Sequence, residues 1–143
     1  RDHRIQFQRQ LAQKAGLLPI SIDKKIDSLC ENLNKFLDTS GEKPALIHGD
    51  LWSGNYFPDS NGNPCIFDPA VYYGLREADI AMTELFGRLP ERFYDAYHEA
   101  FPMNHGYHER KDLYNLYHLL NHLNLFGSSY LSSVQKIVDR FSS

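Results

Sequence analysis

Apolar residues recur every three or four positions over much of the chain, which is the period of an amphipathic helix. This pattern, together with residues that favour helix ends, predicts helices over 5–15, 22–38, 77–86, 90–101, 111–126 and 130–141. The first rests on Phe7, Leu11 and Ala15, four positions apart, with Gly16 suited to end it. We therefore expect a mostly helical chain.

The helix predicted over 22–38 has a clear apolar face. Ile22 and Ile26 begin a series that continues at threes and fours. Ser21 is placed to cap this helix, and Asp23 suits the positive end of the helix dipole. We expect the helix to pack on the core by this one face.

One stretch, residues 45–70, interrupts the helical pattern. It reads A-L-I-H-G-D-L-W-S-G-N-Y-F-P-D-S-N-G-N-P-C-I-F-D-P-A, in which short apolar runs alternate with polar segments. The apolar runs predict three short strands. The segment at 59–63 predicts a hairpin turn rather than a calcium-binding loop, because it lacks the glycine and closing glutamate that such a loop needs. Asp50, Asn55 and Asp68 would then converge at one edge of a small sheet, and the A-V-Y-Y-G-L-R-E segment that follows predicts an ordered loop.

These elements predict an α+β fold that is mainly helical, with a small β-hairpin sheet embedded one third of the way along. A chain of 143 residues with 42% apolar content can bury the core of one domain, which we expect to cover residues 1–143. The sequence contains no repeat, low-complexity tract or long linker that would divide it.

Composition narrows the classes of partner. Fifteen basic and eighteen acidic residues give a net charge of −3, without a basic run longer than a pair, which argues against nucleic acid or an anionic membrane as the main partner. No apolar run approaches the roughly 18 residues of a membrane span, and the first residues lack the apolar core of a secretory signal. Cys30 and Cys65 do not make a disulfide framework. We expect a cytoplasmic protein.

The polar residues of the central stretch suggest phosphoryl-transfer chemistry. Asp50 could accept a proton from a substrate hydroxyl, while Asn55 and Asp68 offer the oxygen ligands that Mg²⁺ prefers beside phosphates and water. Pro69 favours an extended backbone at Asp68, which would hold the carboxylate at the strand tip. His48 is expected to orient the loop through hydrogen bonds to nearby backbone rather than to carry a proton.

The spacing H-x-D-x-x-x-x-N, followed by an Asp at a strand end, resembles the catalytic loop and metal-binding Asp of the protein-kinase-like superfamily. The segments H-G-D-L-W-S-G-N, I-F-D-P-A and Y-G-x-R-E-A-D-I-A-M are together similar to the fructosamine kinase (ketosamine-3-kinase) family, within the aminoglycoside phosphotransferase-like branch. The resemblance runs from about Arg4 to about Phe141, and Arg76, Glu77 and Asp79 match a further block of the family.

The resemblance implies an enzyme that uses ATP and Mg²⁺ to phosphorylate a sugar hydroxyl of fructosamine-type adducts, which leads to deglycation. It makes Asp50 the catalytic base, and Asn55 and Asp68 the ligands of Mg²⁺ and, through it, of the nucleotide. Trp52 would be a wall of the sugar pocket, with plain packing an equal alternative, and His48 is placed beside it on the substrate side. Asp79 would tie the start of its helix to the catalytic loop.

Kinases of this superfamily have two lobes, and no glycine-rich loop followed by a strand lysine occurs before residue 45. We therefore expect the chain to be the helical C-terminal lobe, with the N-terminal nucleotide-clamping lobe absent, and a start at Arg rather than Met fits a preceding segment. The isolated chain should be inactive, and its exposed face could allow self-association. An aminoglycoside- or choline-kinase-like phosphotransferase and a non-catalytic kinase-like binding module are the alternatives. The ketosamine, and whether it is protein-bound, stay open.

Four histidines form two pairs outside this stretch, His105 with His108 and His118 with His122. Neither pair has a Cys or Glu at ligand spacing. We expect hydrogen-bonded or solvated histidines rather than metal ligands.

Overall fold

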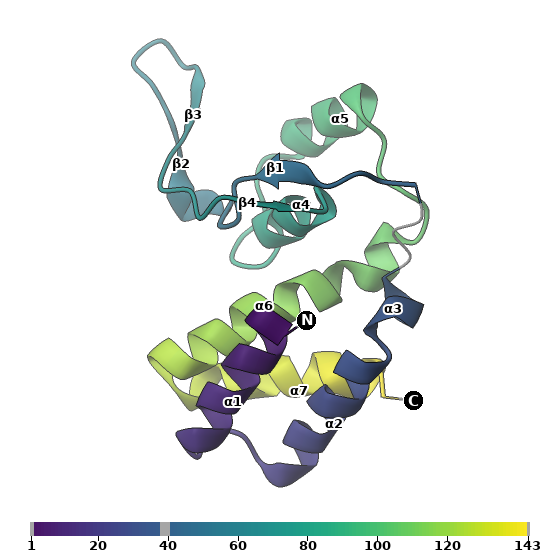
Figure 1. Ribbon diagram of the computed structural model, residues 1–143. Helices are drawn as coiled ribbons and strands as arrows, with labels where there is room; N and C mark the ends of the chain where they lie inside the picture. The colour runs from purple at the N-terminus through teal and green to yellow at the C-terminus, as the bar shows by residue number, and fades with distance from the viewer. Residues whose placement is uncertain (1, 38–40, 143) are drawn as a thin grey trace. The chain divides into compact units, whose positions relative to one another are not determined.

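The computed structural model describes residues 2–37 and 41–142, which form a mainly helical chain with small antiparallel sheets (Figure 1). The fold class predicted from the sequence is confirmed at this level. The contacts divide the chain into two compact units, one of Arg1–Asp38 with Asn115–Ser143 and one of Thr39–Tyr114. The expectation of a single domain over 1–143, and its assignment as a C-terminal lobe, stay predictions.

The first unit consists of helices. They are η1 (Asp2–Gln6, a π-helical turn), α1 (Phe7–Lys14), α2 (Ile20–Glu31), α3 (Leu33–Phe36), the C-terminal part of α6 (Tyr107–Phe126), η3 (Ser128–Tyr130, a 3-10 turn) and α7 (Leu131–Arg140). Helix α7 packs against α2. The predicted apolar face of the second helix is buried, as Ile26 and Leu29 show, and Val134 and Val138 of α7, the helix that contacts α2, are buried as well.

One local prediction in this unit, the cap of α2, was wrong. Helix α2 begins at Ile20 after Pro19, so Ser21 lies inside the first turn and does not cap the helix. Phe7 and Leu11 are exposed, whereas Gln8 and Ala12 of the same helix are buried. The predicted helix is present, and the side chain of buried Gln8 accepts a hydrogen bond at Oε1 from Asn124 Nδ2 at 2.8 Å.

The helix predicted over 22–38 is divided in the structure. It breaks at Asn32 into α2 and α3, and its predicted last residue, Asp38, lies outside the described residues. Asp23 lies in the first turn as expected, and its carboxylate accepts hydrogen bonds from Arg9 at 2.6 and 3.0 Å. The favourable interaction of Asp23 with the helix dipole is therefore joined by an ion pair.

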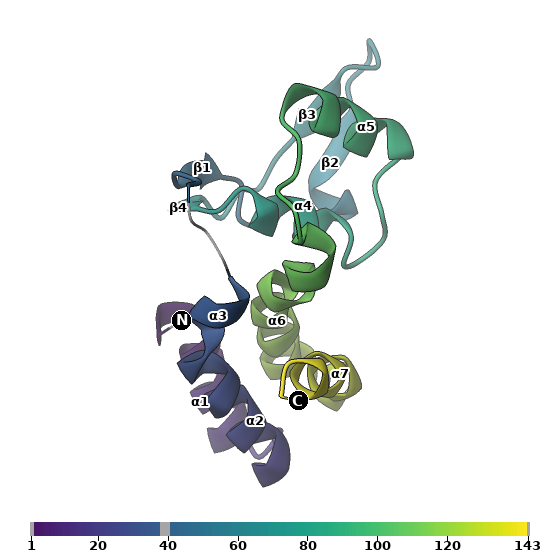
Figure 2. The ribbon, with the colours of Figure 1, turned by 90° about the vertical axis from the view of Figure 1, so that its right-hand side faces the viewer.

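The second unit contains, among its described residues, the strands, a 3-10 turn, and three helices or parts of helices. Its elements are β1 (Ala45–Ile47), η2 (Ser53–Asn55), β2 (Tyr56–Pro58), β3 (Pro64–Ile66), β4 (Tyr72–Gly74), α4 (Glu77–Thr83), α5 (Glu91–Ala100) and the start of α6. Strands β2 and β3 form the predicted hairpin, which projects away from β1 and β4 (Figures 1 and 2). Its turn is held by the Asp59 carboxylate, which accepts hydrogen bonds from the backbone N–H groups of Asn61 and Asn63, each at 2.8 Å.

The segment predicted to be a loop after residue 70 forms β4, which pairs antiparallel with β1. The described residues therefore contain two separate two-stranded sheets in place of the one small sheet that was predicted. The pairing sets Ile47 opposite Tyr72, and Tyr73 points to solvent with 75% of its surface exposed. Three residues are too few for a recognisable alternation, so the partner strand determines this element.

Helix α4 leads from β4 into the core of the second unit. Ile80 and Ala81 are buried together with Tyr107, and Phe93 and Tyr97 of α5 pack against them. Pro90 occupies the N-cap of α5, close to its predicted place in the first turn. No helix in the part of the chain that the structure describes combines the length and the hydropathy needed to cross a membrane.

Candidate active site

The loop that follows β1 is anchored by a carboxylate from α4. The two oxygens of Asp79 accept hydrogen bonds from the backbone N–H groups of His48 and Gly49, at 2.6 and 2.8 Å. Asp79 lies in the first turn of α4. The structure therefore contains the link from helix to loop that the family resemblance implied for this residue.

Gly49 lets two loops approach each other at the backbone. Its φ is +81°, and a Cβ at this position would lie 2.2 Å from the carbonyl oxygen of Ala70. The backbone N–H of Ala70 donates to the carbonyl oxygen of His48 at 2.8 Å. The loop that carries Asp50 is thereby joined to the segment that carries Asp68, and only glycine fits the contact without strain.

The imidazole of His48 joins the same two segments. Its Nδ1 accepts a hydrogen bond from the backbone N–H of Asp50 at 3.3 Å, and its Nε2 lies 3.0 Å from the carbonyl oxygen of Phe67. Because an N–H only donates and a carbonyl only accepts, these partners assign the proton to Nε2. His48 orients the backbone as expected, and its contact with a substrate stays a prediction.

Asp50 and Asn55 are brought into direct contact. The Nδ2 of Asn55 donates to the carbonyl oxygen of Asp50 at 2.9 Å and to its carboxylate Oδ2 at 3.1 Å. Asn55 is buried at the end of η2, where its own N–H donates to the carbonyl oxygen of Trp52 at 2.9 Å. The amide nitrogen is committed to Asp50, so Oδ1 is the atom of Asn55 with the chemistry of a metal ligand.

Asp68 is placed differently from the sequence prediction. Its φ is +54°, the one positive φ outside glycine among the described residues, so the extended backbone predicted from Pro69 was wrong. Strand β3 ends at Ile66, and the next residue is fixed on both sides: the N–H of Phe67 donates to the carbonyl oxygen of Asn55 at 3.1 Å, and its carbonyl accepts from His48. The chain must then turn sharply, and Asp tolerates the left-handed region better than most residues.

These contacts show how the three predicted site residues, Asp50, Asn55 and Asp68, lie relative to one another. Asp50 and Asn55 touch each other, and Asp68 directly follows a residue whose backbone is bonded to Asn55 and to His48. The Asp68 side chain is exposed. A backbone in the left-handed region costs about 1–3 kcal/mol and persists where neighbouring bonds impose it, which is common at functional sites.

Trp52 packs against its neighbours on one side. Its ring meets Phe86 edge to face, with ring centroids 6.3 Å apart, and it covers Gly54 so closely that a Cβ there would lie 2.3 Å from the indole. The ring is half-buried, so part of it remains accessible. The packing role is present, and the role as a wall of a sugar pocket stays a prediction.

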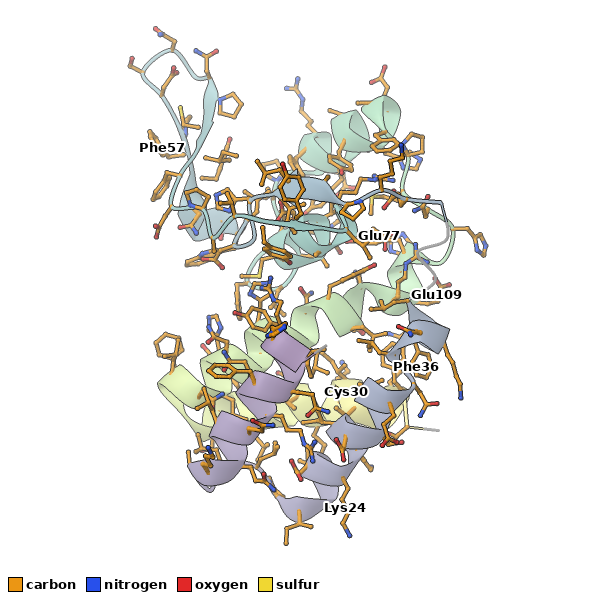
Figure 3. All side chains as sticks on the ribbon, viewed as in Figure 1. Lys24, Cys30, Phe36, Phe57, Glu77 and Glu109 are labelled. Carbon is orange, nitrogen blue, oxygen red and sulfur yellow. The ribbon has the colours of Figure 1, made fainter. Side chains whose placement is uncertain are left out.

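A buried charged network supports α4 and was missed by sequence reasoning. Glu77, at the start of α4 (Figure 3), is 2% exposed and accepts hydrogen bonds from Nε and Nη2 of the Arg110 guanidinium and from the hydroxyl of Tyr114. The hydrogen bond to Glu77 raises the pKa of Arg110 above its ordinary value. Burial and the neighbouring Glu77 charge raise the pKa of Tyr114 as well, so its hydroxyl stays a donor.

A second buried arginine precedes this network. Arg76 donates to Glu42 at 2.6 Å and to the carbonyl oxygens of Phe101 and Pro102 at 3.1 and 2.7 Å, and its guanidinium lies 3.8 Å from the centroid of the Phe101 ring. Nothing in their spacing pairs residue 76 with 42 or residue 77 with 110. The one signal in the sequence was that Arg76 and Glu77 fall in a block that resembles the family.

The donor set suits a hard cation that needs few protein ligands. Asp68 offers a carboxylate and Asn55 an amide oxygen, whereas no group of three His, Cys, Asp or Glu side chains able to hold a metal gathers anywhere in the described ranges. Mg²⁺ is usually held by one or two carboxylates together with substrate phosphates and water. The oxygen donors of Asn55 and Asp68 are of the kind that Mg²⁺ takes, and their binding of Mg²⁺ stays a prediction.

The histidines of the two predicted pairs lie in different surroundings. His118 is buried, and burial lowers its pKa to about 4. His122 Nδ1 lies 2.8 Å from the carbonyl oxygen of His118, and the His108 ring meets that of Tyr107. That none of these histidines is a metal ligand stays a prediction.

The comparisons with known proteins all indicate the same family. The family model described as fructosamine kinase matches residues 1–143. A protein of Vibrio parahaemolyticus named as a probable ketoamine kinase is 46% identical over 142 residues, which cover 99% of this chain and 48% of the relative. The chloroplastic protein-ribulosamine 3-kinase of Oryza sativa subsp. japonica is 46% identical over 140 residues, which cover 97% of this chain and 40% of that protein.

The fold is also found in solved structures. A crystal structure from Thermobifida fusca, of a protein assigned as a fructosamine-3-kinase, superposes with a TM-score of 0.88 at 35% identity and covers 96% of this chain and 47% of that one. The chain thus spans about half the length of the curated relatives and of the solved structure that it matches.

Proposed function

Because this chain belongs to the fructosamine kinase family, we propose that the protein that contains it transfers the γ-phosphoryl group of ATP to a hydroxyl of a ketosamine, the sugar adduct of an amine. The names of the relatives, ketoamine kinases and ribulosamine 3-kinases, support this substrate class. Phosphorylation would destabilise the adduct and so lead to deglycation.

The observation that carries the proposal is the bonded set around Asp50. Asp79 fixes the backbone of the loop, and Asn55 fixes the carbonyl and the carboxylate of Asp50 itself. Phosphoryl transfer depends mostly on positioning and on charge stabilisation, so a carboxylate that is bonded to Asn55 and carried by an anchored loop suits the role of base.

In the proposed step, the substrate hydroxyl oxygen forms a bond to the γ-phosphorus while the bond to the bridging oxygen of ATP breaks and ADP leaves. The carboxylate of Asp50 receives the hydroxyl proton. Asn55 Oδ1 and the Asp68 carboxylate would hold Mg²⁺, which neutralises charge on the phosphates when bound. Trp52 would form one wall of the sugar pocket with the exposed part of its ring. His48 would fix the position of Asp50 relative to the Phe67 carbonyl.

Activity is proposed for the longer protein rather than for these 143 residues alone. The matched relatives are about twice as long, and no glycine-rich loop followed by a strand lysine that could clamp the nucleotide occurs before residue 45. We expect calorimetric titration of the 143-residue chain with MgATP to give little heat, and micromolar binding would contradict this. The N-terminal clamping lobe, self-association of the isolated chain and a cytoplasmic location stay predictions.

A substrate panel tests the reaction class. The full-length protein, supplied with ATP and Mg²⁺, should release ADP with a fructosamine of lysine and not with an aminoglycoside or choline. Turnover of either of the latter would assign the protein to another branch of the superfamily, and no turnover of any substrate would favour a non-catalytic module. Trp52→Ala should raise KM for the fructosamine more than Trp52→Phe, because the phenyl ring keeps a flat apolar wall.

A further inference from the structure

A cavity of about 600 Å³ lies between the hairpin and the start of α5 within the second unit. Its walls are mostly apolar side chains. They come from the loop after Asp50 (Leu51), from both strands of the hairpin (Tyr56, Ile66), and from the segment that leads into α5 (Leu89, Phe93), with Arg92 as the charged residue.

The cavity lies on the opposite face of the hairpin from the Asp68 segment. Successive residues of a strand point to opposite faces, so Tyr56 and its partner Ile66 share the face that lines the cavity, and Phe57 points the other way. Figure 3 shows Phe57 on the side of the hairpin away from α5. Its ring meets that of Phe67, which directly precedes Asp68, with centroids 5.6 Å apart.

The size and lining of the cavity fit a small-molecule ligand. Pockets of roughly 300–1,000 Å³ with apolar and aromatic walls and a few polar groups are typical ligand sites. The five apolar side chains would surround a flat or branched apolar body. Arg92 is exposed at the start of α5, and its guanidinium forms no ion pair with an acid of the described residues, so an anionic group is the chemical match for this end.

We propose that this cavity is a second binding site, for a compact apolar ligand that carries one carboxylate. The ligand body lies between the hairpin face and Phe93, and its carboxylate pairs with Arg92. Leu51 and Tyr56 directly follow Asp50 and Asn55 along the chain, so the ligand touches the backbone segment of the candidate active site without sharing its residues. The proposal concerns binding and does not rest on the phosphoryl-transfer reaction.

Naphthoate is a suitable probe, and naphthylmethylamine is its match of opposite charge. Naphthoate added to the 143-residue chain should shift the methyl resonances of Leu51, Ile66 and Leu89, with a dissociation constant below the millimolar range, and the amine should bind far more weakly. Arg92→Gln should weaken naphthoate binding by roughly tenfold or more, the loss typical of one hydrogen bond to a charged group.

A variant whose side chain fills the cavity tests whether naphthoate binds there rather than elsewhere on the chain. Ile66→Trp should abolish the shifts at Leu51 and Leu89, whereas Leu125→Trp, at an exposed position of the first unit, should leave binding unchanged. If Ile66→Trp fails to fold, Arg92→Gln still decides, because that side chain is exposed.

Three results would overturn the proposal: the absence of methyl shifts at millimolar naphthoate, equal binding of acid and amine, or binding to the 143-residue chain that is lost in the full-length protein. The last would show that another segment of the protein covers the cavity.

Discussion

Asp79 is the residue whose loss should disturb the candidate site most specifically, and Asp79→Asn tests its role with the smallest change of shape. The carboxylate accepts two backbone N–H groups, from His48 and Gly49. The carboxamide keeps one acceptor oxygen and turns an NH₂ donor toward the second amide. A hydrogen bond to a charged group stabilises by about 1.5–3 kcal/mol, so the loop should lose about this much local stability.

Amide hydrogen exchange measures that loss directly. A decrease of about 1.5–3 kcal/mol in the free energy of local opening raises the exchange rate roughly 10- to 150-fold. We expect this rise at His48 or Gly49, or both, in the Asp79→Asn chain, measured by NMR. Asp95→Asn, which removes an exposed carboxylate from α5 of the same unit, is the matched control and should change neither rate. Exchange at both amides that stays within threefold of the unaltered chain would refute the anchoring role.

Three further variants test the surrounding structure. Gly49→Ala should lower the thermal stability clearly more than Gly16→Ala, because both have positive φ but only Gly49 faces a backbone oxygen within 2.2 Å; equal losses would remove the close approach from the account. Glu77→Gln should lower the free energy of unfolding, measured by urea denaturation, by about 3–5 kcal/mol, since it leaves the buried Arg110 charge unpaired. An exposed ion pair contributes at most ~1 kcal/mol, so a loss smaller than this would contradict the prediction. Burial lowers the pKa of His118 to about 4, below the roughly 6.5 of an unfolded chain, so the unfolded state binds more protons between these pH values. The free energy of unfolding should therefore fall by up to roughly 3 kcal/mol as the pH decreases from 6.5 to 4. His118→Gln should flatten this dependence of the unfolding free energy on pH, and an unchanged dependence would show that another group causes it.

The long elements followed from the sequence because their signal is local. The apolar period located all six predicted helical regions, and α5 was correct to about one residue at each end. Helix α6 begins at Tyr107, four residues earlier than predicted, where hydrogen bonds to the preceding loop rather than an apolar period extend it. Helix propensity and period therefore predict the body of a helix better than its ends.

The features that could not be predicted from the sequence depend on residues that are distant along the chain. Strand β4 exists because β1 pairs with it, and the left-handed backbone of Asp68 exists because both sides of the Phe67 peptide are already bonded. The buried pair of Glu77 and Arg110 likewise joins residues far apart in the chain. In contrast, the contact of Asp50 with Asn55 could be predicted, since a tight turn over five residues leaves few alternatives.

The role of Asp50 as the base is the central claim, and it is tested most directly by the turnover of a fructosamine by full-length protein carrying Asp50→Asn. The variant keeps the shape of the side chain, and Asp95→Asn serves as the control for the change in charge. If Asp50 accepts the hydroxyl proton, kcat should fall by about 10²- to 10⁴-fold, the usual contribution of a general base, with an unchanged circular dichroism spectrum and unchanged affinity for MgATP. A kcat within threefold of the unaltered protein would contradict the account.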